Sequence, residues 1–183
     1  MQPLRLAAKW SLEWRGARFI ELGGARLQSS LNDCGPTALA EFLELEGRPV
    51  PSRDSLLRLT RTGRYGTTLA QLETAATLSG LRVFAIAWSP MELRDLPVPS
   101  LAWVDHRHFV VVARRDAADS VEVHDPAAGR YRMATEQFAR VWSGAALVPL
   151  DSISPHRAAG DWSVTRSHRP RGTRAHRSRT TEG

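Results

Sequence analysis

The chain has 183 residues, of which 42% are hydrophobic and 24% are charged, a composition typical of a globular protein long enough to bury one core. Its longest uninterrupted apolar run, from Val83 to Trp88, is far shorter than the ~18–20 residues that cross a bilayer, and no signal peptide opens the sequence. These features indicate a soluble, cytoplasmic protein. The single cysteine, Cys34, excludes an internal disulfide and a paired-cysteine zinc ribbon.

The net charge of +6 is concentrated near the C-terminus. Residues 1–150 contain 18 basic and 16 acidic residues, whereas residues 151–183 contain 7 basic and 3 acidic residues. Few large apolar residues follow Leu150, so we expect disorder from about Ser152. A nucleic-acid-binding arm is the alternative, but Trp162 is the tail's one aromatic residue for base stacking, and we expect no nucleic-acid partner. The predicted division is an N-terminal extension (1–24), one domain (25–150) and a basic tail (151–183).

The N-terminal extension contains a predicted helix and a predicted strand. Leu6, Trp10 and Trp14 are spaced four apart, which is typical of one helical face. Residues 19–22 read as a short strand, and Gly23-Gly24 as a turn. The double glycine could alternatively be a site of self-cleavage.

Three helices are predicted next. The first runs from Thr37 to Glu46, with Leu39, Phe42 and Leu43 on its apolar face and Glu41, Glu44 and Glu46 off it. The second begins at Ser52 and continues to about Arg61. The third begins at Thr68, where Gln71 completes a capping box, and ends at Gly80.

The rest of the sequence is strand-like. Short β-rich runs, bounded by proline and aspartate clusters, cover residues 81–88, 100–105, 108–114, 120–124, 130–133 and 145–150. Thr135 is predicted to cap a brief helix over residues 136–142. Helices followed by an antiparallel meander indicate the α+β class.

Cys34, His108 and Asp125 are the candidate catalytic residues. A thiol at a helix start feels the positive end of the helix dipole, which favours the nucleophilic thiolate. His108 opens a strand, and Asp125 ends the next one. If the two strands form a hairpin centred near residues 116–117, residues 108 and 125 pair at its open end. The pattern therefore supplies a nucleophile, a base and a group that orients the base.

Gln28 precedes Cys34 by six residues, and its amide could donate to a developing oxyanion together with the Cys34 backbone N–H. Other interpretations remain open at this point. Cys34 could be a small buried hydrophobic residue. Cys34, His106, His108 and Asp125 could instead bind zinc.

Four motifs in order resemble the C39 peptidases, papain-like cysteine proteases that cleave bacteriocin and related leader peptides after a double glycine. Gln28 followed by Cys34-Gly35 is similar to the family's signature, and Asp33 before the cysteine is typical of its active members. The other three segments that carry the resemblance are Gly66-Thr67-Thr68-Leu69, His108-Phe109-Val110-Val111 and Asp125-Pro126.

The resemblance implies a papain-like fold, with N-terminal helices packed on an antiparallel sheet. It implies that Cys34 is the nucleophile, that His108 is the general base and then the acid, that Asp125 orients the imidazole, and that Gln28 supports the oxyanion. No cofactor or metal is implied. His106 and His124 match no motif position and are interpreted as structural or exposed.

The best-known C39 domains belong to transporters, but the sequence contains neither a phosphate-binding GxxxxGK[ST] loop nor a membrane span. We therefore expect a stand-alone peptidase, or one that works with a separate ABC transporter, acting on a peptide with a Gly-Gly leader. The alternative is a catalytically silent module of the same fold that binds leader peptides.

Overall fold

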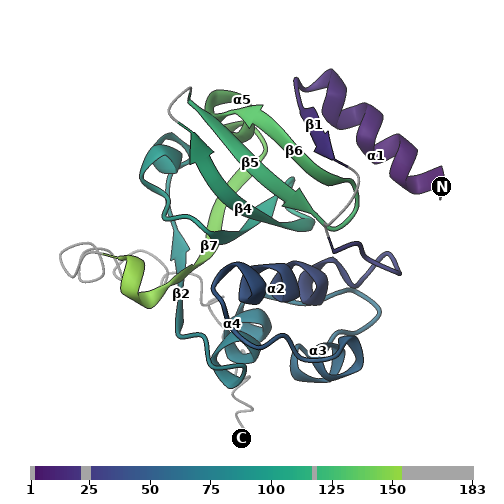
Figure 1. Ribbon diagram of the computed structural model, residues 1–183, viewed down its shortest axis with the longest axis vertical. Helices are drawn as coiled ribbons and strands as arrows, with labels where there is room; N and C mark the ends of the chain where they lie inside the picture. The colour runs from purple at the N-terminus through teal and green to yellow at the C-terminus, as the bar shows by residue number, and fades with distance from the viewer. Residues whose placement is uncertain (1–2, 22–25, 117–118, 154–183) are drawn as a thin grey trace, which may run out of the picture. The chain divides into compact units, whose positions relative to one another are not determined.

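The computed structural model describes residues 3–21, 26–116 and 119–153. The predicted Gly23-Gly24 turn and the predicted disorder of the tail beyond Ile153 lie outside the described residues. Helices and strands occur in the expected order, helices mainly first and strands after them (Figure 1). The predicted α+β class is confirmed.

Most elements lie within a few residues of their predicted bounds. In chain order they are α1 (Pro3–Trp14), β1 (Arg18–Glu21), α2 (Cys34–Leu45), α3 (Arg53–Leu59), α4 (Leu69–Leu78), β2 (Val83–Ala87), the 3-10 helix η1 (Pro90–Asp95), β3 (Ser100–Val104), β4 (His108–Asp116), β5 (Ser120–Asp125), β6 (Gly129–Ala134), α5 (Thr135–Ala139), β7 (Trp142–Pro149) and the 3-10 helix η2 (Leu150–Ser152).

Helix caps explain where two helices begin. The side chain of Ser52 accepts a hydrogen bond from the Ser55 N–H at the start of α3, and Thr68 and Gln71 form the predicted capping box of α4. The predicted cap at Thr135 is wrong. Strand β6 runs directly into α5, so Ala134 takes the cap position and Thr135 becomes the first helical residue. Trp142, predicted to end this helix, begins β7 instead.

The seven strands form one sheet in the order β1-β6-β5-β4-β3-β7-β2, with antiparallel neighbours. The predicted meander is right for β3 to β6 but wrong for β2 and β3, because β7 returns and lies between them. An inserted strand of this kind is decided by long-range packing, which the local pattern of each strand does not encode.

Apolar side chains cover both faces of the sheet. Leu101, Phe109 and Val111 pack under the helices α2, α3 and α4, whereas their neighbours Ala102 and Val110 join a second core on the opposite face. Alternate residues of β3 and β4 therefore point into two different cores, which explains why these strands are apolar without a period of two. Figure 1 shows α2, α3 and α4 grouped on one side of the sheet.

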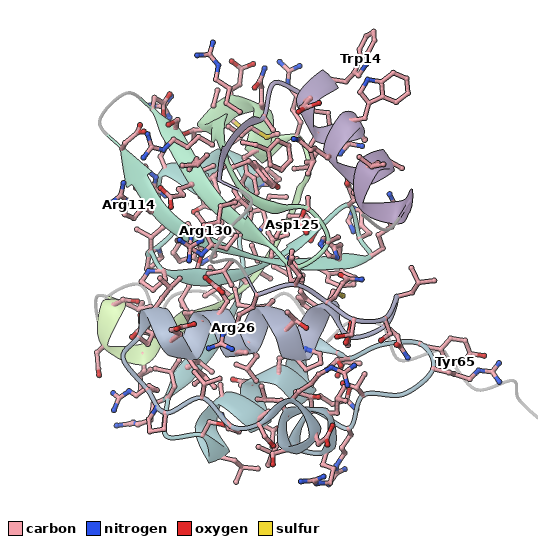
Figure 2. The ribbon with its side chains drawn as sticks, turned by 45° about the vertical axis from the view of Figure 1, so that its right-hand side comes forward. Trp14, Arg26, Tyr65, Arg114, Asp125 and Arg130 are labelled. Atoms are coloured by element: carbon pink, nitrogen blue, oxygen red, sulfur yellow. The ribbon has the colours of Figure 1, made fainter. Side chains whose placement is uncertain are left out.

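The predicted N-terminal helix is confirmed as α1, but its apolar stripe does not enter a core. Leu6, Trp10 and Trp14 are exposed, while Leu12 packs against the sheet. Figure 2 shows Trp14 projecting outward from α1. The periodicity therefore predicted the helix correctly, and the face that these three residues share points to solvent.

Candidate active site

Cys34 is the first residue of α2 and is half-buried against the helical core. The residue after it must be small, because a β-carbon on Gly35 would lie 3.1 Å from the Thr67 β-carbon. Asn32 also binds this neighbouring segment, donating from Nδ2 to the Gly63 carbonyl over 2.9 Å. The Gly66–Leu69 motif therefore packs against the segment that holds the thiol, although residues 35–65 separate Cys34 from this motif along the chain.

His108 begins β4, and its Nε2 lies 2.7 Å from Oδ1 of Asp125 at the end of β5. Asp125 thus occupies Nε2 and leaves Nδ1, and Cys34 lies near enough to His108 for the two side chains to shift each other's pKa. Asp125 is further held by the Ala127 N–H, which donates to the same oxygen over 2.7 Å. The structure thus brings together the three predicted residues from α2, β4 and β5.

The predicted register of this hairpin is wrong. Val111 pairs with His124 and Val112 with Val123, so continuing the ladder places Asp125 opposite residue 110 rather than residue 108. The register shifts after Val112, and the ladder continues to the pair Asp116–Ser120. The imidazole and carboxylate still meet, because long side chains reach a diagonal neighbour on the same face.

Cys34 and His108 each shift the pKa of the other toward the charged form. Burial opposes the charged form of each, but the hydrogen bond and charge of Asp125, with those of Cys34, raise the pKa of His108 to about 10. Burial likewise opposes ionisation of the thiol. The hydrogen bond and positive charge of His108, with the N–H groups of Phe109 and Gly35, nevertheless lower the pKa of Cys34. These partners therefore favour the thiolate form of Cys34 and the imidazolium form of His108.

Gln28 lies in the loop before Cys34, where its Nε2 donates to the Ser30 carbonyl over 2.9 Å. Its backbone N–H donates to the Pro126 carbonyl over 2.9 Å, which ties the loop to the residue after Asp125. The side chain lines the same cleft as His108. Gln28 is therefore brought to the site, with one amide hydrogen already used inside the loop.

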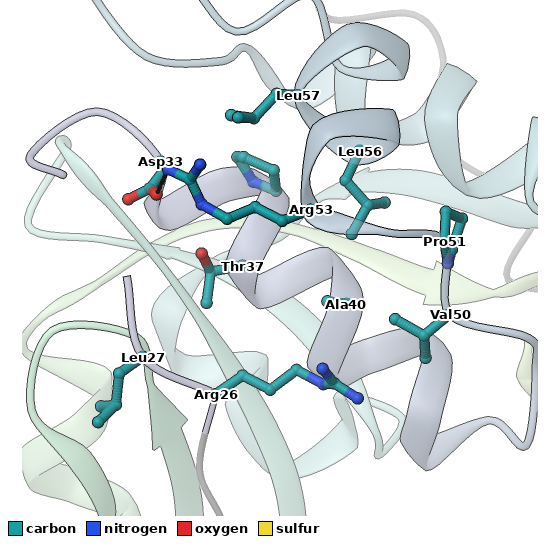
Figure 3. Close-up of a pocket in the computed structure, with 11 residues that line it drawn as sticks. Arg26, Leu27, Asp33, Thr37, Ala40, Val50, Pro51, Arg53, Leu56 and Leu57 are labelled. Atoms are coloured by element: carbon teal, nitrogen blue, oxygen red, sulfur yellow. Dashed lines mark hydrogen bonds and ion pairs between the residues drawn. The ribbon is translucent and has the colours of Figure 1, made fainter. Parts of the chain in front are cut away.

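Asp33 holds this loop in shape. It is 1% exposed, accepts hydrogen bonds from the N–H groups of Ser29 and Ser30, and forms an ion pair with Arg53 over 2.7 Å. Burial raises the pKa of Asp33, but these partners outweigh it and the pKa is lowered. Figure 3 shows Arg53 reaching from α3 to Asp33 beside a pocket of about 130 Å³. An acidic residue directly before a helix was the signal for this role.

Glu41, predicted to lie off the apolar face of α2, is nevertheless only 4% exposed, because another side of the helix is buried as well. Its Oε1 lies 2.6 Å from His124 Nδ1, and Arg130 Nη2 lies 3.4 Å from the same oxygen. His124 Nε2 lies 3.2 Å from Glu122. The buried carboxylate is tolerated because His124 and Arg130 bind it. Helical periodicity does not predict partners that lie on other elements.

The zinc interpretation gains no support. His106 lies exposed in the turn between β3 and β4, with a φ of 53°, instead of following the strand toward Cys34. Within residues 3–21, 26–116 and 119–153, no group of three or more His, Cys, Asp or Glu side chains is arranged to hold a metal ion.

A cleft of about 640 Å³ opens beside the catalytic residues, a size within the ~300–1,000 Å³ of ligand sites. His108, Asp125 and Gln28 line it, together with Tyr131 and residues of α1. The site therefore combines a thiol of lowered pKa, an imidazole near it and space for a ligand.

The family model that matches this chain is that of the peptidase C39 family, over residues 25–153. A curated relative from Methanothermobacter thermautotrophicus, described as an uncharacterized protein, is 34% identical over 67% of this chain and 84% of its own length. The probable functional amyloid protease FapD of Pseudomonas aeruginosa is 28% identical over 71% of this chain and 60% of its own length. The lactococcin-G-processing and transport ATP-binding protein LagD of Lactococcus lactis is 26% identical, over 67% of this chain but 18% of its own length.

Two solved structures share the fold. The peptidase domain of Streptococcus ComA, a bifunctional ABC transporter involved in quorum sensing, superposes with a TM-score of 0.59 at 27% identity, over 68% of this chain and 95% of that domain. A double glycine motif protease from an AMS/PCAT transporter, in complex with its leader peptide, superposes with a TM-score of 0.63 at 24% identity, over 68% of this chain and 89% of that protease. The helices and antiparallel sheet therefore form the papain-like fold expected from the sequence.

Proposed function

Because the chain belongs to the peptidase C39 family, we propose that it is a cysteine endopeptidase that cleaves peptides after a double-glycine leader, with catalysis assigned to residues 25–150. One observation carries the proposal. His108 holds Asp125 at Nε2 and lies near enough to Cys34 for the two side chains to shift each other's pKa, which supplies a nucleophile, a base and a group that orients the base.

Acylation would begin with attack of the Cys34 thiolate on the carbonyl carbon before the scissile bond. The resulting oxyanion accepts hydrogen bonds from the Cys34 backbone N–H and the Gln28 amide. His108 then donates its Nδ1 proton to the leaving nitrogen, the C–N bond breaks, and a thioester remains on Cys34. Asp125 keeps the imidazole oriented and stabilises its positive charge.

Deacylation uses the same groups in reverse. Nδ1 of the neutral His108 takes a proton from water, and the oxygen attacks the thioester carbonyl. The C–S bond breaks, which releases the leader as a carboxylic acid and restores the thiolate beside the imidazolium. The proton balance closes over the two steps, since His108 gives one proton in acylation and regains one in deacylation.

The proposed substrate is a bacteriocin-like precursor or another peptide with an apolar leader that ends in Gly-Gly. This specificity rests on the likeness to the leader-binding double glycine motif protease, together with the four motifs that match the family. We place the reaction in the cytoplasm, where the single cysteine stays reduced.

We further propose that the peptidase acts apart from the transporter that exports its product. The match covers 84% of the Methanothermobacter relative, which leaves that protein no room for transporter domains. In LagD, by contrast, the match covers 18% of the protein. Among the described residues, no helix is long and apolar enough to cross a membrane.

A peptide library tests the proposal. Synthetic peptides with randomised apolar leaders, Gly-Gly and an eight-residue cargo are incubated with wild type and with Cys34→Ala, and products are identified by mass spectrometry. We expect wild type to cut after the second glycine, and Cys34→Ala to yield no product. Matched peptides with Ala-Ala in place of Gly-Gly should remain intact. Binding of Gly-Gly peptides without product from wild type would identify a silent leader-binding module and refute the enzyme.

A further inference from the structure

Helix α1 forms one wall of the catalytic cleft. His108, Asp125 and the loop of residues 28–31 line one side of the cavity of about 640 Å³, and Ala7, Ala8, Ser11 and Leu12 of α1, with Arg15 directly after the helix, line another. This helix lies outside residues 25–153, which match the family model. The cleft therefore has a wall that the family's own segment does not supply.

Several contacts hold α1 in place. Leu12 packs against the sheet core, and Arg15 Nη1 donates to both carboxylate oxygens of Asp105 over 2.9 and 3.2 Å. Strand β1, which follows α1 directly, pairs with β6. Asp105 lies in the tight turn that leads into His108, with a φ of 50°. The helix is thus tied to the same turn that presents the catalytic imidazole.

Catalytic chemistry indicates which part of a substrate faces this wall. In acylation, the imidazolium delivers its proton to the leaving nitrogen, so the segment after the scissile bond must pass His108. His108 lines the cleft and Cys34 does not. The cleft therefore extends from the leaving-group side of the reaction centre.

We propose that α1 is a specificity wall for the segment that follows the scissile bond, a role that rests on the proposed peptidase function. Ala7, Ala8 and Ser11 have small side chains, which keep the cleft wide enough for a cargo chain with ordinary side chains. A large side chain at this position would fill the space that such a cargo needs.

The test compares two substrates that differ only after the bond. The fastest-cut Gly-Gly leader from the library is joined either to its eight-residue cargo or to alanine amide alone. In Ser11→Trp, we expect kcat/KM to fall at least tenfold for the long cargo and less than twofold for alanine amide. The matched control is Leu6→Trp, on the exposed side of α1, which should leave both values within twofold of wild type.

Two outcomes would overturn the inference while the peptidase function stands. An equal loss of kcat/KM on both substrates would mean that Ser11 does not act on the cargo side. No loss on either substrate would mean that α1 is not a wall of the substrate cleft. A library in which wild type cuts no Gly-Gly peptide would overturn the peptidase function and this inference with it. Unchanged alkylation of Cys34 by iodoacetamide in Ser11→Trp checks that the catalytic pair is intact.

Discussion

Two histidines of the same sheet, His108 and His124, each bind a carboxylate, yet their surroundings differ. His108 binds Asp125 through Nε2 and lies near the Cys34 thiol, at the edge of a cleft, with a side chain 20% exposed. His124 lies between Glu41 and Glu122, one at each ring nitrogen, and its side chain is 5% exposed.

A carboxylate partner does not by itself make a histidine catalytic. Proton transfer needs a ring nitrogen that faces a reacting group, and His108 has one. Both nitrogens of His124 are held by carboxylates, so the residue instead joins α2 to β5, directly before Asp125. We propose that His108 moves protons, whereas His124 fixes the distance between two elements that carry candidate catalytic groups.

Removal of the nucleophile or base should have the largest effect. Cys34→Ala and His108→Ala are each expected to lower kcat/KM by about 10⁴- to 10⁶-fold, because attack and proton transfer act as one unit. Peptide cleavage followed by mass spectrometry measures the loss. Alkylation by iodoacetamide at pH 7 should also slow in His108→Ala, since the thiolate loses its cation. A fully active His108→Ala would contradict the assignment.

Asp125→Asn should lower kcat/KM by about 10³-fold, since the orienting charge is lost while the hydrogen-bonded shape remains. It should also change the pH profile of cleavage. In wild type, activity falls in acid as the Cys34 thiolate is protonated, and in alkali as His108 loses its proton near its pKa of about 10. Without the Asp125 charge this pKa falls, so the alkaline limb should move to lower pH. An unmoved limb would show that Asp125 does not act on His108.

Gln28→Ala should slow cleavage by ~10²–10³-fold, as expected for one lost oxyanion donor. The loss should fall on kcat, because the donor acts on the charge that develops in the transition state. Steady-state kinetics with a Gly-Gly peptide separates kcat from KM. Gln28→Glu has a similar size but no N–H at that position, so it should be as slow as the alanine variant. A normal rate in Gln28→Glu would remove the oxyanion role.

His124→Ala should have the smallest effect on rate and a clear effect on stability. It leaves Glu41 buried without its main partner, which typically costs ~3–5 kcal/mol of unfolding free energy, as measured by urea denaturation. Rates per folded molecule should stay within tenfold of wild type. A loss of rate as large as that of His108→Ala, in folded protein, would erase the difference between the two histidines.

Glu41 adds a pH dependence to this cluster. Its pKa is lowered, because the His124 hydrogen bond and other partners outweigh burial. The stability that it contributes is therefore present above the ordinary glutamate pKa of ~4.3 and is lost as the pH falls through the lower folded value. Urea denaturation of wild type and Glu41→Gln from pH 7 to pH 3 should show the difference between them shrinking in acid.

Local signals predicted much of this molecule. The caps at Ser52 and Thr68, the apolar runs of the strands and the four ordered motifs depend on residues close together in sequence, and they indicated both the helices and the catalytic candidates. Sequence patterns did not predict features that depend on partners far away along the chain. The buried Glu41 needed His124, 83 residues away, and the exposed Trp10 and Trp14 had the period of a core face without a core to pack against.

The amino-acid sequence by itself determined the kinds of element, their order and which residue types could do chemistry, because propensity, capping and periodicity act over a few neighbouring residues. Tertiary structure alone decided the insertion of β7 between β3 and β2, the shifted register of β4 and β5, and the placement of α1 against the cleft. Those features arise from contacts between residues far apart along the chain. Their energies depend on how whole elements pack, and no local pattern records that.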